Sequence, residues 1–239
     1  MKPNYFHFKI LPVLFSFFFI SQLCSGQAAL VLLIFGNKLA TEELHLSIDG
    51  ALNTSNISGF GSGQAAVGLN FGLGLHVKLN EHWEFNPQFR PLSQKGLHGI
   101  SPITILPVEL SDEKTQLRMN YIELPLMIRY QLSKRVYVGF GPQLSFLVSA
   151  RQRSLGNYLN GEQAEFKINV IDEFAKLDFS LPSEFGYRLK VRNKKSGSDF
   201  NFSLFLRYQH GFNELLNNSG SGTRMSTWQL GISIPTIRY

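Results

Sequence analysis

Residues 120–132 read Asn120-Tyr121-Ile122-Glu123-Leu124-Pro125-Leu126-Met127-Ile128-Arg129-Tyr130-Gln131-Leu132. From Ile122 to Leu132 the even positions are apolar or aromatic, whereas Glu123, Arg129 and Gln131 stand at odd positions. Successive side chains of a β-strand point to opposite faces, so one face of this segment is expected to meet apolar surroundings and the other polar ones. A soluble sandwich would also alternate, but this segment exceeds the usual strand of about 5 to 6 residues and is long enough to cross a bilayer.

The same alternation recurs along the chain, in segments 44–53, 64–79, 83–92, 136–148, 177–191, 200–212 and 224–239. The connections alternate as well: the long ones are 54–63, 93–117, 151–176 and 213–223, and the shorter ones are 80–82, 133–134 and 192–199. Bacterial outer-membrane barrels alternate short periplasmic turns with long external loops. The sequence therefore predicts an all-β fold, an eight-stranded antiparallel up-and-down transmembrane β-barrel with both ends on the periplasmic side.

The N-terminus predicts export. Two lysines, the apolar run 10–20 and small residues around 25–28 are typical of a secretory signal peptide over residues 1–28. A lipoprotein signal using Cys24 is disfavoured, because Leu23 is not the small residue expected there; Cys24 is the only cysteine. The barrel domain is expected over 44–239, preceded by an N-terminal segment, 29–43. The apolar part of that segment extends the signal, lies at the membrane surface, or enters the periplasmic mouth.

Composition limits the function classes. Charged residues make up 17% and aromatic residues 13% of the 239 residues, which suits a wall in lipid. The net charge of +6 raises the question of whether the protein binds nucleic acid. However, several basic residues fall in the signal peptide or in turns, without the interleaved aromatic platform of single-strand binders, so no nucleic-acid partner is expected. Arg151 and Arg153 could contact lipopolysaccharide phosphates, although simple solvation is favoured.

Several motifs together resemble one known family, the PorT-like outer-membrane β-barrel domain proteins. The motifs are Trp83-Glu84-Phe85-Asn86-Pro87-Gln88-Phe89 ending in Gln94-Lys95-Gly96, Tyr121-Ile122-Glu123-Leu124-Pro125-Leu126 leading to Arg129-Tyr130, Tyr137-Val138-Gly139-Phe140-Gly141-Pro142, and Leu206-Arg207-Tyr208 followed by Gly211. The resemblance implies an eight-stranded outer-membrane barrel without a shared catalytic residue, some members of which assist protein secretion. The C-terminus departs from the pattern: Pro235 interrupts it, and Tyr239 replaces the commoner final Phe read by the barrel-assembly machinery.

The lumen is the candidate functional site. An eight-stranded barrel is just wide enough to be filled by side chains. Buried charges are costly unless paired, so a lumen ion network is favoured over a selective polar path or ligand pocket, with Glu123 opposite Arg129 or Arg207. The charged residues expected in it are Asp49, Glu84, Arg90, Glu123, Arg129, Asp178, Glu184, Arg188 and Arg207.

Three hypotheses about function remain open. The favoured one is a structural or interaction barrel, an accessory of a secretion or surface machine, which would contact a protein partner through loops 93–117 and 151–176. The second is a narrow porin or small-ligand binder, which bulky inward residues such as Met127, Phe205 and Arg207 disfavour. The third is a lipid-modifying enzyme using His98 and Ser101. No catalytic residue, cofactor or metal is expected, because the histidines lack metal-site spacing and the GxGxxA match at 61–66 precedes a strand.

Overall fold

Strands of the predicted kind run through the described part of the chain in the computed structural model. The structure describes residues 43–59, 63–192, 199–217 and 222–236, so the expected signal peptide 1–28 and all but the last residue of the segment 29–43 lie outside it. Contacts divide the chain into two units, residues 1–40 and 41–239, and every described residue belongs to the second unit. No helix among the described residues is long and apolar enough to cross a membrane.

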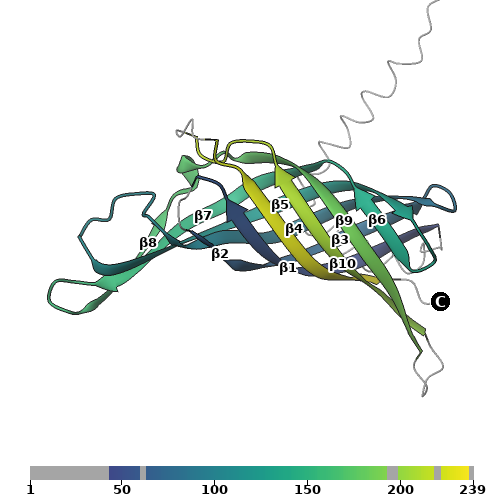
Figure 1. Cartoon of the computed structure of the whole chain (residues 1–239), viewed down its shortest axis with the longest axis horizontal. Coiled ribbons are helices and arrows are strands. Elements are labelled where there is room, and N and C mark those ends of the chain that lie inside the picture. Colours follow the sequence, from purple (N-terminus) through teal and green to yellow (C-terminus); the bar gives the residue numbers. More distant parts are fainter. Residues whose placement is uncertain (1–42, 60–62, 193–198, 218–221, 237–239) are drawn as a thin grey trace, which may run out of the picture. The chain divides into compact units, whose positions relative to one another are not determined.

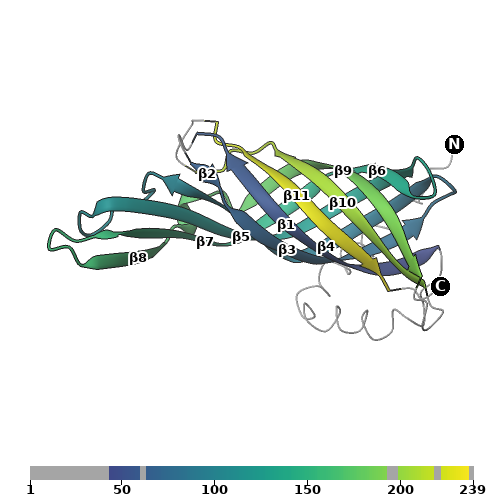
Figure 2. The same cartoon turned by 60° about the horizontal axis from the view of Figure 1, so that its bottom comes forward.

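The sheet closes on itself as a ring of eight tilted antiparallel strands (Figures 1 and 2). β6 and β7 follow one another along one position of the ring, interrupted at Gly141-Pro142, and both pair with β5 and β9. The predicted eight-stranded up-and-down barrel is confirmed. The ring strands are β1 (Leu44–Ile57), β3 (Val67–Lys78), β4 (Trp83–Ile100), β5 (Ser111–Gln131), β6 (Val136–Phe140), β7 (Gln143–Asn157), β9 (Leu177–Arg192), β10 (Asp199–Gly211) and β11 (Met225–Pro235).

Burial alternates along the strands as the sequence predicts. In β5, Tyr121, Glu123, Met127 and Arg129 are buried inside the ring, whereas Leu126 between them is 46% exposed on the outer face. Large apolar side chains are exposed around the ring, which is the pattern of a wall that contacts lipid. Examples are Leu52, Leu69, Phe71, Phe140, Phe146, Val148, Phe185, Leu206, Leu230 and Ile232.

The prediction of long loops at 93–117 and 151–176 is wrong over most of both ranges. β4 continues to Ile100, β5 begins at Ser111, and β7 continues to Asn157, where it pairs with the added strand β8 (Gln163–Asn169). We call this extension of β4, β5, β7 and β8 beyond the ring the protruding sheet; it lies at the left in Figures 1 and 2. Short β2 (Gln64–Ala65) pairs with β4 at its base, and η2 (Ile171–Glu173) follows β8.

The physical reason for this error is an exchange of polarity between the two faces. On the N-terminal side of residue 120 in β5, the inward side chains are apolar, as at Leu117 and Met119, and the outward ones are polar, as at Arg118. A search for strands with an apolar outer face therefore stops at this point. The lipid-facing part of the strand ends here, but the strand itself does not.

An apolar cluster fills the end of the ring next to the protruding sheet, which we call the long-loop end; the opposite end, with turns 79–82 and 132–135, is the short-turn end. We call this cluster the apolar plug. The connections after β8 and β10 join it, because Ala175 N donates to Leu215 O (2.8 Å) and Asn217 N to Glu173 O (2.9 Å). Its buried members are Ile57, Leu97, Ile100, Leu117, Met119, Tyr121, Leu147, Ala150, Val170, Phe174, Leu215 and Met225.

Candidate functional site

One level of the lumen carries alternating charges because the strand register places them side by side. Glu84 of β4 lies opposite Arg129 of β5, and Glu184 of β9 lies opposite Arg207 of β10; Gly139 of β6 stands between the two pairs. Since inward positions recur every second residue, a shift of one residue in the pairing register would move these charges to the outer face. The barrel fold itself therefore assembles this group.

The charged groups at this level form a connected set, which we call the ion network: Glu84, Arg129, Glu184, Arg188 and Arg207. Arg129 Nη2 lies 2.7 Å from Glu184 Oε1, and Arg129 Nη1 lies 3.3 Å from Glu84 Oε1. Arg207 donates to Glu184 Oε2 from Nε (2.8 Å) and also from Nη2. Arg188, more exposed than the others, donates to Glu84 Oε2 at 2.9 Å. Each carboxylate thus bridges two guanidinium groups.

A tyrosine ring supports the two arginines that contact Glu84. The Arg129 guanidinium lies 4.7 Å, and that of Arg188 5.5 Å, from the centre of the Tyr137 ring, a distance at which cation–π attraction operates. Gly186 faces the same ring, and a Cβ added there would overlap it. This glycine is needed because the tyrosine ring occupies the space of its missing side chain.

A second ion pair lies closer to the apolar plug, and its basic residue was not predicted from the sequence. Lys95 Nζ lies 2.6 Å from Glu123 Oε1, and both side chains are buried. Asn70 Nδ2 donates to Glu123 Oε2 at 3.3 Å. Arg129 and Arg207 were the partners expected for Glu123, but both contact Glu184 instead. Lys95 was missed because it falls in the range assigned to a loop; its place in the Gln94-Lys95-Gly96 motif was the only signal.

The remaining predicted lumen residues, Asp49, Arg90 and Asp178, are buried inside the ring but make no ion pair with the described residues. Neutral side chains bind two of them. Arg90 donates to Gln88 Oε1 (3.1 Å) and Gln229 Oε1 (2.7 Å), while Asp49 accepts from Ser47 Oγ at 2.9 Å. Glutamine and serine at inward positions thus hydrogen-bond lumen charges that lack an opposite charge.

Three lumen groups lie at the distances of a serine–histidine–acid relay. His76 Nε2 is 2.9 Å from Ser47 Oγ, and His76 Nδ1 is 2.7 Å from Glu84 Oε1. A nucleophile must reach its substrate, but Ser47 is completely buried and its hydroxyl also contacts Asp49. These contacts therefore extend the ion network. The pair suggested from sequence, His98 and Ser101, does not come together as a relay: His98 pairs along the sheet with Gln64 and Gln116, and Ser101 is exposed.

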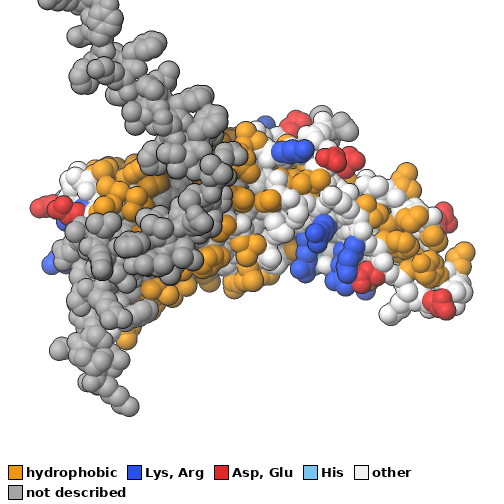
Figure 3. Space-filling view, turned by 180° about the vertical axis from the view of Figure 1, so that it is seen from behind, with side chains coloured by type: hydrophobic (Ala, Val, Ile, Leu, Met, Phe, Trp, Pro, Cys, Tyr) orange, Lys and Arg blue, Asp and Glu red, His pale blue; other side chains and the backbone are white. Residues whose placement is uncertain are grey.

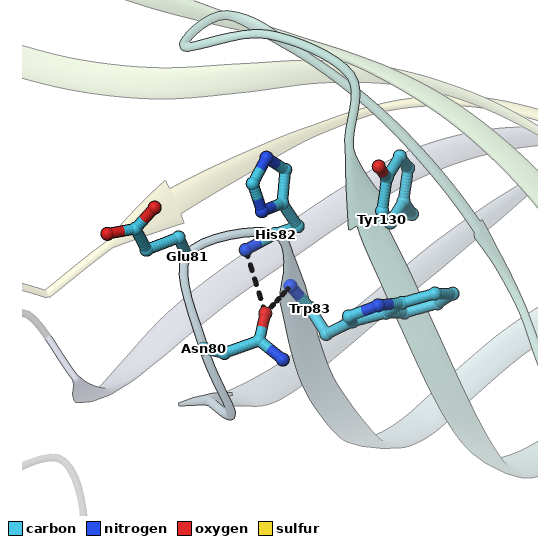
Figure 4. A pocket seen from close by; sticks show the side chains of 5 residues that line it. All are labelled: Asn80, Glu81, His82, Trp83 and Tyr130. Atoms are coloured by element: carbon cyan, nitrogen blue, oxygen red, sulfur yellow. Dashed lines mark hydrogen bonds between the residues drawn. The ribbon is translucent and has the colours of Figure 1, made fainter.

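A pocket of about 380 Å³ lies outside the lumen, at the β3–β4 turn (Figure 4). The Asn80 side-chain oxygen accepts hydrogen bonds from the backbone N–H groups of His82 and Trp83, both at 2.9 Å, which fixes the turn. Trp83 packs edge-on against Tyr130, with ring centres 4.8 Å apart. Aromatic side chains at the end of a membrane strand are typical of the interfacial girdle, and this explains the pocket without a ligand.

The protruding sheet has ion pairs of its own on its outer surface. Glu165 of β8 accepts from Arg153 Nε at 2.8 Å and lies 2.9 Å from Lys167 Nζ. The hydrogen bonds from Lys167 and Arg153 hold the pKa of the Glu165 carboxyl below its ordinary value. Exposed pairs of this kind contribute little to stability.

One family model matches most of the chain in the comparisons with known proteins. Residues 38–217 match the family model described as "Outer membrane protein beta-barrel domain". Similar solved structures include Neisserial surface protein A (12% identity, covering 81% of this chain and 97% of that chain, TM-score 0.39), Ail of Yersinia pestis (12%, 80% and 97%, 0.36) and OprG of Pseudomonas aeruginosa (10%, 82% and 96%, 0.39). No curated protein matches the sequence. The family match covers well over half of the chain, which therefore belongs to the outer-membrane protein β-barrel domain family.

Proposed function

We propose that this protein is a closed outer-membrane barrel that serves as an interaction component, a PorT-like accessory of a secretion or surface machine, and holds a protein partner on its protruding sheet. The observation that carries the proposal is the unpaired outer edge of β8. A closed barrel has no strand edges, and where a natural sheet has an exposed edge strand, that strand is usually short or covered. Here a strand of seven residues is added beyond the ring, and among the described residues it pairs with β7 alone.

The groups available at that edge follow from the hydrogen-bond phase of β8. Val170 N donates to Ala150 O of β7 at 3.0 Å. Because alternate residues of an antiparallel strand bond to the same neighbour, the backbone groups of Phe166 and Ile168 point to β7, and those of Glu165 and Lys167 point away from it. An extended segment of a partner could pair with these free N–H and C=O groups as an added strand.

The closed lumen supports an interaction role over transport. Met127, Phe205 and Arg207 point inward and are at most 2% exposed, and the apolar plug fills the long-loop end. Ions would have to displace paired charges at one level and apolar side chains at the next. The barrel thus serves as a rigid anchor for the sheet.

The edge contact is tested by Lys167→Pro. Proline removes the outward N–H of residue 167 without removing a bond to β7, and edge strands tolerate it. With a photo-crosslinking side chain at Gln163 in intact cells, we expect a protein adduct of the wild-type chain and at least a roughly tenfold loss in the variant. The control Lys167→Ala removes the same side chain but keeps the N–H, and should retain the adduct. Heat-modifiable gel mobility verifies folding. An adduct that survives in Lys167→Pro, or none in the wild type, contradicts the proposal.

Planar-bilayer recording separates this proposal from a narrow porin. The folded protein is expected to give no reproducible single-channel steps, because the ion network and the apolar plug leave no continuous water path. Heat-modifiable mobility of the same sample shows that the barrel is folded. Reproducible, ion-selective steps would overturn the closed lumen and favour the porin hypothesis.

The route to the membrane is part of the proposal. We expect residues 1–28 to direct export and the barrel-assembly machinery to insert the strands into the bilayer. Short turns then face the periplasm, and the protruding sheet faces the outside of the cell, as the alternation of short and long connections supports.

A further inference from the structure

Two arginines stand side by side on the outer surface of the sheet, just beyond the lipid-facing wall. Arg118 of β5 is the cross-strand partner of Arg151 of β7, and both side chains are exposed. The preceding pair toward the ring, Asn120 and Ser149, is joined by a hydrogen bond of 3.0 Å. Next comes the apolar pair Ile122 and Phe146. The outer surface thus changes within a few residues from apolar through neutral polar to doubly cationic.

The height of this pair matches the headgroup layer of a bilayer. Arg118 lies two positions beyond Asn120, the first polar residue on the outer face of β5, which is about 7 Å along a strand and about 5 Å along the membrane normal at a tilt of about 40°. The headgroup regions add about 5 to 7 Å on each side of the hydrocarbon core. Arg118 and Arg151 therefore lie where lipid phosphates lie. Figure 3 shows Lys and Arg side chains gathered beside the hydrophobic surface of the ring.

Nothing in the described part of the chain neutralises the two charges. Farther out, Arg153 and Lys167 share the carboxylate of Glu165, but neither Arg118 nor Arg151 makes an ion pair or side-chain hydrogen bond with a described residue. The flanking positions on β4 and β8 are Gly96 and Asn169, both uncharged. Like charges directly opposite one another on a sheet are destabilising. An anion between the two guanidinium groups would remove this repulsion.

We propose that Arg118 and Arg151 together bind a phosphate group of a phosphorylated outer-leaflet glycolipid, that is, of lipopolysaccharide. Opposite side chains on one face of a sheet start about 5 Å apart, so both guanidinium groups can reach one phosphate. The planar guanidinium donates two parallel hydrogen bonds to phosphate oxygens. The acyl chains of the same lipid would lie along the apolar wall below the pair, around Phe146 and Val148. The choice of lipid rests on the proposed outward orientation of the protruding sheet.

The test uses the full chain purified from outer membranes into detergent, with the lipid exchanged away. Binding of purified lipopolysaccharide is measured by native mass spectrometry for the wild type and the double variant Arg118→Gln, Arg151→Gln. We expect the variant to bind about tenfold more weakly, which corresponds to the loss of one or two charge-assisted contacts. Lipopolysaccharide stripped of its phosphates should bind both proteins equally weakly. Inorganic phosphate should compete only at far higher concentration, since it lacks the acyl contacts.

The matched control is Lys134→Gln with Arg135→Gln, which removes the same charge from the short-turn end and should leave binding unchanged. Equal weakening in the control would indicate general charge attraction and overturn the proposal, as would no weakening in the arginine variant. Equal affinity for inorganic phosphate and lipid would indicate a free-anion site instead. The proposal would also be contradicted if the double arginine variant lost binding to a sulfated polysaccharide but bound lipopolysaccharide as tightly as the wild type. Because only purified protein and lipid are used, the outcome does not depend on the partner contact at β8.

Discussion

Glu184→Gln is expected to lower the free energy of unfolding by about 3 to 5 kcal/mol, the cost of removing one partner from a buried ion pair. Glu184 lies between Arg129 and Arg207, and all three side chains are at most 2% exposed. The glutamine side chain has nearly the same volume, so no cavity adds to the effect. It leaves two arginine charges in the lumen with only Glu84 within ion-pair distance of one of them.

Equilibrium unfolding of the refolded barrel by urea, followed by the fluorescence of Trp83 and Trp228, measures this loss. The control Glu165→Gln removes a carboxylate that also bridges two cations but is exposed, and should change the unfolding free energy far less than Glu184→Gln does. Adding Arg207→Gln to Glu184→Gln removes one of the unpaired charges and should restore part of the stability. A loss below about 1 kcal/mol for Glu184→Gln would mean that water enters the lumen and solvates the arginines.

Phe174→Ala is expected to release the cover of the long-loop end, at a cost of about 3 kcal/mol or more to the packing of the apolar plug. Phe174 is completely buried, and its backbone pairs with Leu216 across the mouth of the ring. The two connections that close this end therefore meet at Phe174, whose side chain belongs to the apolar plug. We expect faster proteolytic cleavage within 170–176 and 212–217, while the ring remains folded.

Limited proteolysis of the folded protein in detergent, with cleavage sites identified by mass spectrometry, measures this opening. Leu159→Ala is the control, because Leu159 lies in the tip between β7 and β8 and is 93% exposed. It should leave cleavage within 170–176 unchanged. If Phe174→Ala leaves cleavage there at the wild-type rate, the two connections are held by their backbone hydrogen bonds and not by the plug.

The ring could be predicted from the sequence because lipid imposes one rule on every membrane strand. Wherever one face of a strand meets acyl chains, as at Leu124 and Leu126, the alternation identifies the strand and shows which of its side chains point to the lipid. The protruding sheet could not be found in this way. Beyond the membrane the outer face meets water and the inner face meets the plug, so Leu117 and Arg118 reverse the expected pattern.

Alternation along one strand indicates which charged side chains turn inward, but it does not indicate which of them pair. Period two places Glu84, Arg129 and Glu184 inside, since inward positions need only the alternation of one strand. Which charges meet depends on the stagger between strands, and the bulge between Asn120 and Tyr121 is an example that the sequence does not reveal. Lys95 was missed for a different reason: its strand was expected to end at Leu92.

The exchange of polarity between the faces of β5 also sets how deep the barrel sits in the bilayer. Sliding the barrel inward would carry Arg118 and Arg151 toward the hydrocarbon, where an arginine on the lipid face of a barrel costs about 2 to 4 kcal/mol at the midplane. Sliding it outward would expose the rings of Trp83 and Tyr130 at the opposite end to water. Vertical displacement is thus opposed in both directions. A fixed immersion depth keeps β8 at a constant height above the membrane, which is what a partner on the cell surface would encounter.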